Sequence, residues 1–229
     1  MQLKIISWNI WIDGYFDQTV DFLKTSSADI IGLQEVRADD PGRNIIGYLE
    51  ELGYKHVFAP VKKTWGEKVW NDGPAIFSKY NIIKSEKFIL SKTDCRAAIM
   101  ADIQIGGKIF HVFNTHLIHT HQRPSKIQDE QAAALIKALP LERVIVMGDF
   151  NATPDSTAIK SLKNTLVDSD PTSAPTWSLY PEGCLECNPQ DVSTRLDYIF
   201  TSKDIKTNSF KAENSKGSDH LPISVIIEI

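Results

Sequence analysis

The sequence predicts an α/β protein in which two β-sheets pack face to face with helices outside them. Short β-rich apolar runs alternate with stretches of helical periodicity along the whole chain. Strands outnumber helices, and helices occur in both halves, a mixture that favours a sandwich of two sheets. No linker composition divides the 229 residues, so we expect a single domain over residues 1–229.

The first half of the chain predicts two helices among short strands. Val20–Leu23 lies in a short amphipathic helix, and Ile45–Leu52 repeats at helical spacing before Gly53, a typical C-terminal cap. Ile30–Val36 is almost continuously apolar, as expected of a strand buried on both faces. The other strands predicted here are Leu3–Ile10, Val57–Ala59, Ala75–Ser78 and Ile82–Leu90.

The second half predicts a hairpin, two helices and three further strands. Gly106-Gly107 separates the strands Ala97–Ile105 and Ile109–Thr115, which is a hairpin signal. The clearest helix is Ser125–Leu139, which opens after Pro124 and closes at Pro140. A short helix is expected at Ser156–Leu162, and strands at Val144–Met147, Asp197–Thr201 and Ile223–Ile229.

Two stretches, Val61–Pro74 and Ser169–Thr194, show no regular pattern. The second is rich in Pro, Asp and Asn, and a loop of that length inside a compact domain is usually functional or mobile. The first carries Trp65 and Trp70 among lysines. Both are therefore candidate substrate-binding segments.

Composition and charge limit the setting in which the protein acts. The net charge of −4 argues against holding nucleic acid by a bulk positive field, although it allows local basic patches. No apolar run is long enough for a bilayer, and the first residues lack the layout of a signal peptide. Three cysteines do not make a disulfide framework. We expect a cytoplasmic monomer with unpaired cysteines and no membrane anchor.

Short polar clusters stand at six predicted strand ends. Such positions can converge on one rim of a sandwich, where a rigid scaffold aims them. A lone Asp or Asn beside a strand is usually a turn former, but six clusters, two of them with His, are harder to attribute to turns. The clusters contain Asn9, Glu35, Asn114 with His116, Asp149 with Asn151, Asp197, and Asp219 with His220.

The side chains in these clusters suit one kind of chemistry. Carboxylate and amide oxygens favour a hard cation such as Mg²⁺ or Mn²⁺. An Asp with a neighbouring Asn can orient and deprotonate a water, and His can stabilise phosphate oxygens. No Cys or Ser nucleophile stands beside a base, so covalent catalysis is not indicated.

The ordered motifs resemble those of the endonuclease/exonuclease/phosphatase superfamily. The match spans residues 7–222, and the resemblance implies a DNase I-like four-layer α/β/β/α sandwich that hydrolyses phosphoester bonds with Mg²⁺ or Mn²⁺. The motifs are Trp-Asn-Ile, Leu-Gln-Glu, Asn-Thr-His-Leu, Gly-Asp-Phe-Asn, Arg-Leu-Asp-Tyr-Ile-Phe and Ser-Asp-His-Leu-Pro.

The resemblance also implies a role for each matched residue. Glu35 would be the principal metal ligand, with Asn9 beside it and Asp219 close by. Asp149 would orient or deprotonate the attacking water, and Asn151 would bind the phosphate.

Three further matched residues complete the predicted site. His220 would contact the scissile phosphate, with Asp197 as its paired carboxylate. His116 would be a second histidine that faces the phosphate. These roles agree with what phosphoryl transfer requires, an in-line water, a cation and donors for the developing charge.

The substrate class is open among several branches of the superfamily. Trp11 and Val36-Arg37 depart from the abasic-site endonuclease pattern, and Phe150 departs from the tyrosyl-DNA phosphodiesterase pattern. A nucleic-acid phosphodiester is our leading expectation, and a lipid or small phosphoester is the alternative. A binding protein with a decayed site is a third interpretation, which the intact carboxylates and histidines disfavour.

Basic, aromatic and amide side chains in and around these motifs are candidate substrate contacts. Lysines can contact a phosphate backbone and tryptophans can stack on bases, although charges that only solubilise loops and tryptophans that cap the core are the favoured interpretations. The candidates are Arg96, Asn114, Arg195, Lys62, Lys63, Trp65, Lys68, Trp70, Arg123 and Trp177.

Two short motifs raise the question of a second metal. Cys184 and Cys187 have the spacing of half a zinc knuckle, but no second cysteine pair exists, so two loop thiols are favoured. His119 and His121 could bind a metal, and a solvated loop is the favoured interpretation.

Overall fold

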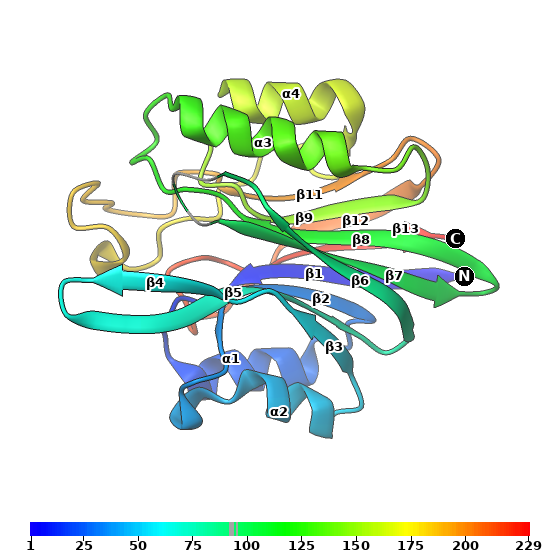
Figure 1. Cartoon of the computed structure of the whole chain (residues 1–229), viewed down its shortest axis with the longest axis horizontal. Helices are drawn as coiled ribbons and strands as arrows, with labels where there is room; N and C mark the ends of the chain where they lie inside the picture. The colour runs from blue at the N-terminus through cyan, green and yellow to red at the C-terminus, as the bar shows by residue number, and fades with distance from the viewer. Residues whose placement is uncertain (92–93, 95) are drawn as a thin grey trace.

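Two mixed β-sheets lie face to face in the computed structural model, and helices cover the outer face of each sheet (Figure 1). The structure describes residues 1–91, 94 and 96–229. This arrangement is the four-layer α/β/β/α sandwich that the sequence predicts. The helices are α1 (Phe16–Thr25) and α2 (Ile45–Glu51) on one side, and α3 (Lys126–Ala138) and α4 (Thr157–Thr165) on the other.

Within the described residues, the first sheet has seven strands in the order β12-β13-β1-β2-β5-β3, with β4 paired to β5. β1 and β2 are parallel, and α1 makes the crossover between them. The strands are β1 (Gln2–Asn9), β2 (Ile30–Arg37), β3 (Lys55–Phe58), β4 (Val61–Trp65), β5 (Lys68–Ser78), β12 (Lys206–Ala212) and β13 (Ile223–Glu228).

The second sheet, counted over the same described part of the chain, has six strands in the order β10-β11-β9-β8-β7-β6. Here β8 and β9 are parallel, and α3 crosses between them. Each sheet therefore contains one parallel pair joined by a helix. The strands are β6 (Asn81–Ile89), β7 (Ala97–Ile105), β8 (Lys108–His116), β9 (Val144–Asp149), β10 (Val167–Asp168) and β11 (Asp197–Thr201).

Apolar side chains fill all three spaces between the layers. The central core between the sheets includes Ile5, Ile103 and Val225, all fully buried. Separate clusters lie beneath α1 and α2 and beneath α3 and α4. Burial of each such side chain stabilises the fold by about 1.5–3 kcal/mol. Loops at the edge of the sandwich can therefore carry polar side chains at little risk to the fold.

One buried polar contact joins the two sheets close to the site. Asn114 on β8 accepts a hydrogen bond from Gln34 Nε2 at 2.7 Å. Its own Nδ2 donates to the carbonyl oxygens of Leu33 and Ala75, each at 2.8 Å. The expectation that Asn114 contacts substrate is corrected by this placement, because its amide is fully buried and bonded to the opposite sheet.

The structure also corrects two predictions of secondary structure. Residues 61–72, expected to be irregular, form the β4–β5 hairpin, which turns at Gly66-Glu67. The strand β12, Lys206–Ala212, was not predicted, because it is a largely polar edge strand with little apolar alternation. The helix expected over Ser125–Leu139 is confirmed, and those two residues are its caps.

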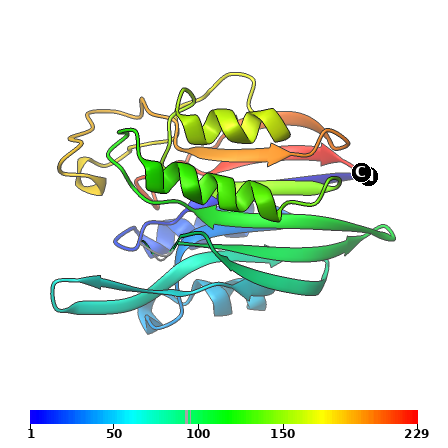
Figure 2. The same ribbon diagram turned by 45° about the horizontal axis from the view of Figure 1, so that its top comes forward.

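Two long segments project from the end of the sandwich opposite the termini (Figure 2). One is the β4–β5 hairpin, and the other is the segment 169–194, which is largely irregular as predicted, with the short helix η2 at Pro181–Gly183. Residues 1 and 229 meet at the far end, where the Met1 ammonium donates to the Ile229 carbonyl at 3.0 Å. The projecting segments thus flank the rim at which β1 ends.

Candidate active site

The strand ends predicted to converge do so at this rim. Asn9 ends β1, Glu35 lies near the end of β2, His116 ends β8 and Asp149 ends β9. Because both parallel pairs point the same way, their carboxyl ends place these four side chains together between the sheets. Asn9 joins the two halves directly, since its Nδ2 donates to Glu35 Oε1 at 3.1 Å and to Asp149 Oδ2 at 3.0 Å.

An irregularity in β2 sets the direction of the Glu35 side chain. The pairing of β2 with β5 shifts between Leu33 and Val36, and Glu35 adopts a positive φ of 60°. Such a conformation is uncommon for a residue other than glycine and is typical of bulges at functional sites. The bulge aims the carboxylate at Asn9 and at the backbone N–H of Ile12, which donates to Oε2 at 2.8 Å.

The surroundings of Glu35 fit a divalent cation. Burial raises the pKa of Glu35 to about 7, with further contributions from the Asp72 and Asp219 carboxylates. None of the three forms an ion pair with a Lys or Arg among the described residues. Clustered oxygens that form no direct ion pair with a Lys or Arg side chain are the kind of donor set that Mg²⁺ or Mn²⁺ prefers. Glu35, Asn9 and Asp219 would hold the ion.

Asp149 is positioned by a close approach of β8 and β9. A Cβ atom on the preceding Gly148 would collide with the carbonyl oxygen of Thr115, and the φ of Gly148 is 151°. The Asp149 carboxylate accepts the backbone N–H of Asn151 at 2.8 Å and the Asn9 amide on its other oxygen. Burial raises the pKa of Asp149 despite His220, which moves it toward the range useful for a general base.

Two histidines flank Asp149 and differ in charge. The Nε2 atoms of His116 and His220 lie 3.4 and 3.6 Å from Asp149 Oδ2. Burial lowers the pKa of His116 well below its usual value, and Arg96 and Lys63 add to the effect. Burial opposes protonation of His220 too, but Asp197, Asp149 and Asp219 outweigh it and raise its pKa well above the usual value. At neutral pH, His116 is neutral and His220 is an imidazolium.

A chain of hydrogen bonds orients His220. Its Nδ1–H donates to Asp197 Oδ2 at 2.8 Å, and the Thr176 hydroxyl donates to the same oxygen at 2.7 Å. Thr176 Oγ1 in turn accepts the backbone N–H groups of Leu196 and Asp197. His220 Nε2 is therefore left facing Asp149 and the open rim, as a contact with the scissile phosphate requires.

The 169–194 loop supplies Thr176, which the sequence analysis did not place in the site, and gives Trp177 a different role from the one suggested. Thr176 orients Asp197, and Trp177 donates its indole N–H to Asp219 Oδ2 at 3.0 Å. Trp177 is buried, so capping of the core describes it better than stacking on bases. Their contacts join parts of the chain 21 and 42 residues apart, which no local motif reveals.

At this rim, two groups of described side chains could hold a catalytic cation, the set around Glu35 and a second set that includes His220. Ligand atoms of Asp149, Asp197 and His220 lie within 4.8 Å of one another. In that group, however, His220 is already hydrogen bonded to Asp197. We favour the oxygen-rich set around Glu35, because Mg²⁺ and Mn²⁺ prefer oxygen ligands and that set has no internal cation.

Arg195 is not the substrate contact that the sequence suggested. Its guanidinium is buried and makes a bidentate pair with Asp168, at 2.9 and 2.7 Å. Asp170 lies 3.6 Å from its Nε, and the Tyr198 ring packs 4.1 Å from its guanidinium carbon. Arg195 therefore ties the start of the 169–194 loop to β11.

Arg195→Ala is expected to lower the free energy of unfolding by about 3–5 kcal/mol, because it leaves the buried Asp170 without its counter-charge and Asp168 with Lys163 alone. Urea unfolding followed by circular dichroism measures this change. Arg123→Ala is the matched control, since its pair with Glu186 is exposed and such pairs contribute at most about 1 kcal/mol. Equal, small losses in both variants would refute the structural role of Arg195.

The remaining predicted contacts lie around the β4–β5 hairpin. Arg96 is half-buried beside Asp94, and together with Lys63 it influences the pKa of His116. Trp70 is half-buried, and its indole donates to Asp72 at 2.7 Å. Trp65 ends β4, but its side chain lies outside the described residues, as does Cys95. A role for Trp65 and Trp70 in substrate binding stays a prediction.

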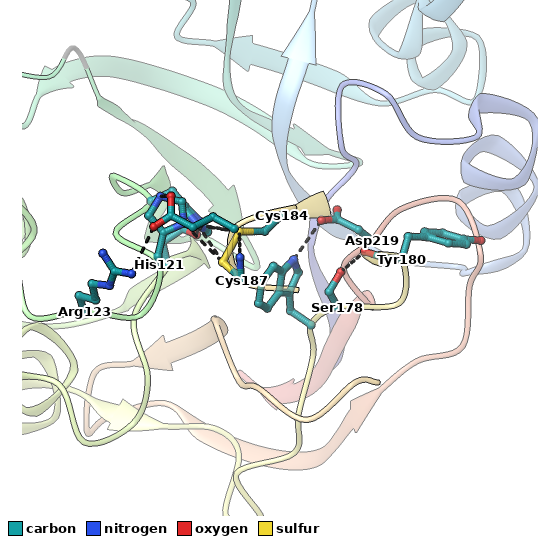
Figure 3. The surroundings of a disulfide bond; sticks show 11 residues. His121, Arg123, Ser178, Tyr180, Cys184, Cys187 and Asp219 are labelled. Atoms are coloured by element: carbon teal, nitrogen blue, oxygen red, sulfur yellow. Dashed lines mark hydrogen bonds and ion pairs between the residues drawn. A yellow bond between two sulfur atoms is a disulfide. The ribbon is translucent and has the colours of Figure 1, made fainter. Parts of the chain in front are cut away.

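Cys184 and Cys187 form a disulfide, which corrects the expectation of unpaired thiols for these two residues (Figure 3). His119 and His121 lie against this pair rather than in a solvated loop. His119 Nδ1 also lies 2.9 Å from Asn151 Oδ1, so this group adjoins the predicted phosphate-binding residue.

None of the helices in the described residues is long and apolar enough to cross a membrane.

Solved structures share this fold at low sequence identity. An endonuclease/exonuclease/phosphatase from Beutenbergia cavernae has 17% identity and a TM-score of 0.82, covering 100% of this chain and 72% of its own. The human Nocturnin catalytic domain with bound sulfate has 21% identity and a TM-score of 0.71, covering 99% and 94%. A mannosyl-6-phosphatase from Bacteroides thetaiotaomicron has 18% identity and a TM-score of 0.72, covering 99% and 100%.

The likeness to these structures concerns the DNase I-like fold. No curated protein sequence matches the chain. The model of the Endonuclease/Exonuclease/phosphatase family, in contrast, matches residues 6–220, which contain every residue of the site described above. The chain therefore belongs to the endonuclease/exonuclease/phosphatase family of phosphoesterases.

Proposed function

We propose that the protein is a divalent-metal-dependent phosphodiesterase that cleaves nucleic acid with an activated water. The observation that carries the proposal is the placement of Asp149 between a neutral and a charged histidine, next to the Glu35 oxygens. A cation held by Glu35, Asn9 and Asp219 would neutralise charge on the phosphate.

The chain's own residues supply the proton transfers and the fixed donors. Asp149 Oδ2 lies next to the Nε2 atoms of both histidines, and we assign to it the acceptance of a proton from the attacking water. The His220 imidazolium, held by Asp197, donates to a phosphate oxygen as negative charge develops there. The backbone N–H of Asn151 holds the other oxygen of the Asp149 carboxylate in place. These donors are fixed before substrate arrives, which lowers the reorganisation needed in the transition state.

The β4–β5 hairpin supports nucleic acid as the substrate class. It projects beyond the sandwich beside the rim, with Lys62 and Lys68 exposed and Lys63 half-buried near His116 (Figure 1). Such a basic projection can follow a phosphate backbone over several nucleotides. A small phosphoester would fill the rim without reaching the hairpin.

A panel of substrates tests both the reaction and its specificity. With Mg²⁺ or Mn²⁺ present, bis-p-nitrophenyl phosphate tests diester hydrolysis, and no release with either ion or any panel member would overturn the enzymatic assignment. The panel contains single-stranded DNA, RNA, abasic duplex, 5′-tyrosyl DNA, sphingomyelin and inositol phosphates.

The lysines of the hairpin give a separate prediction. Lys62/Lys63/Lys68→Ala should lower kcat/KM on the preferred nucleic acid by about tenfold at low salt and make its salt dependence shallower. Hydrolysis of bis-p-nitrophenyl phosphate should change much less, and Lys62/Lys68→Ala, which keeps Lys63 beside His116, should leave it at the wild-type rate. Lys24/Lys137/Lys203→Ala is the matched control, with the same change in charge at exposed positions on other surfaces.

A lipid or small phosphoester is the alternative substrate, and the net charge of −4 favours it, since it gives little long-range attraction for a polyanion. The mannosyl-6-phosphatase has a TM-score as high as that of Nocturnin, so the fold suits either class. A turnover rate that changes neither with salt concentration nor in the Lys62/Lys63/Lys68→Ala variant would favour this alternative.

A further inference from the structure

Four metal-ligating side chains from two distant loops meet beside the active site. His119 and His121 lie in the segment that follows β8, and Cys184 and Cys187 lie in the 169–194 loop. Their ligand atoms all fall within 4.8 Å of one another, and all four side chains are buried or half-buried. Figure 3 shows both cysteines beside His121, with Asp219 on the other side of the same loop segment.

The distances between nitrogen and sulfur match the edges of a zinc tetrahedron. His121 Nδ1 lies 3.4 Å from each sulfur, and His119 Nε2 lies 3.8 and 3.7 Å from Cys184 and Cys187. The two nitrogens are 3.2 Å apart. Zn–S and Zn–N bonds of ordinary length in a regular tetrahedron place N and S about 3.6 Å apart, and two N atoms about 3.3 Å apart.

The outer nitrogen of each histidine already has an oxygen partner. His119 uses Nε2 toward the sulfurs, while its Nδ1 lies 2.9 Å from Asn151 Oδ1. His121 uses Nδ1 toward the sulfurs, while its Nε2 lies 3.4 Å from Glu186 Oε2. Histidines that ligate a metal characteristically donate their other N–H to such an acceptor, which fixes the tautomer and the ring. The backbone N–H of Cys187 also donates to Cys184 Sγ at 3.0 Å.

We propose that the reduced chain binds one Zn²⁺ through His119 Nε2, His121 Nδ1 and the thiolates of Cys184 and Cys187. Reduction of the disulfide by two equivalents of a thiol breaks the S–S bond, adds two electrons and two protons, and oxidises the reductant to its own disulfide. Zn²⁺ then replaces the two thiol protons, and the sulfurs separate to about 3.8 Å, the tetrahedral S···S edge. A reducing compartment would maintain this form.

The metal would hold together two segments that line one side of the active site. It joins the segment after β8 to the loop that carries Thr176 and Trp177, which contact Asp197 and Asp219. Gly183, next to Cys184, packs so closely on Asp219 that any side chain there would collide with its carboxylate. Through His119 the same centre holds the amide of Asn151. The site is thus a structural centre distinct from the Glu35 group.

Zinc content and cobalt spectroscopy of the untagged, full-length protein test the proposal. Protein reduced with a phosphine and freed of metal should retain one Zn²⁺ per chain after gel filtration in Mg²⁺ buffer. Co²⁺ should give intense tetrahedral d–d bands together with a thiolate-to-cobalt charge-transfer band. Cys184→Ser/Cys187→Ser should abolish the charge-transfer band, and His119→Asn/His121→Asn should weaken Zn²⁺ binding at least tenfold.

Controls separate this site from adventitious binding. His56→Asn changes a histidine on β3, away from this group, and should bind Zn²⁺ as the wild type does. Glu186→Gln should weaken binding by about 10–100-fold, as loss of the partner of a ligating histidine does. No retained Zn²⁺ in the reduced wild type would overturn the proposal, and so would retention undiminished in either double variant. These readouts need no hydrolysis, so they stand apart from the proposed phosphodiesterase.

Discussion

Asp149→Asn should lower kcat by about 10²–10⁴-fold, with little change in KM, because the amide keeps the shape of the carboxylate but cannot accept a proton from water. The Asp149 carboxylate is buried, fixed by Asn9 and Asn151, and flanked by His116 and His220. Steady-state hydrolysis of bis-p-nitrophenyl phosphate at saturating Mg²⁺ gives both constants.

The control for this substitution is Asp155→Asn, a nearby exposed aspartate bonded only to Thr153 within its own loop. It should keep wild-type turnover. Circular dichroism and thermal melting check that Asp149→Asn is folded. Near-wild-type kcat in a folded Asp149→Asn protein would remove Asp149 from the role of general base.

Glu35→Gln should have two opposite effects, a loss of metal affinity and a gain in the stability of the metal-free protein. The folded-state pKa of Glu35 is raised from 4.5 to about 7, so its ionisation opposes folding as pH rises through this range. If Glu35 were fully shielded from solvent, its ionisation would lower the free energy of unfolding by about 3 kcal/mol near pH 8. Because Glu35 is partly exposed, we expect a loss of about 2 kcal/mol. The amide removes the cost.

The pH dependence distinguishes this cause from other sources of stability. In EDTA, the advantage of Glu35→Gln should be full above pH 7 and vanish below about pH 4.5, where the wild-type carboxyl is protonated in both states. Chemical denaturation across this range measures it. Glu213→Gln, which removes a carboxylate paired with Lys4, is the control and should not stabilise the protein.

Metal binding supplies the second half of the Glu35 prediction. Below pH 7 a proton competes with the cation, so wild-type Mn²⁺ affinity should fall about tenfold per pH unit. Glu35→Gln should bind Mn²⁺ weakly and lose most of this dependence, and excess metal should partly restore its rate. Unchanged affinity in the variant would exclude Glu35 as a principal ligand.

The local signals of the sequence predicted most of the layers but not the polar edges. Two segments are apolar enough to predict buried strands, and the structure confirms both of them: Ile30–Val36 and Val144–Met147. The β4–β5 hairpin and β12 have exposed residues on both faces, so they lack the apolar alternation that announces a strand. The partner of β12 is β13, which a local window around β12 does not contain, whereas β4 and β5 pair with each other and are missed only because the hairpin is polar.

Site residues that follow strand ends could be predicted from the sequence. Residues whose hydrogen-bond partners are distant in the sequence could not. Arg195 is two positions from Asp197, which suggested a substrate contact, but its partner Asp168 lies 27 residues earlier. The Asn114 amide likewise donates its hydrogen bonds to the carbonyl oxygens of Leu33 and Ala75 in the other sheet. The cysteines meet His119 and His121 across more than 60 residues, so neither half of that cluster is informative alone.

The Asn9 bridge between Glu35 and Asp149 has a consequence for how the molecule assembles. Glu35 belongs to one sheet and Asp149 to the other, so each carboxylate can stay hydrated while its own sheet forms. Asp149 loses its water, and Glu35 part of its water, when the two sheets dock, which is also when the central apolar core closes. Docking of the sheets therefore brings the two carboxylates together and carries the cost of their desolvation, whereas a chain with only one sheet formed would hold neither carboxylate against the other and would not bear that cost.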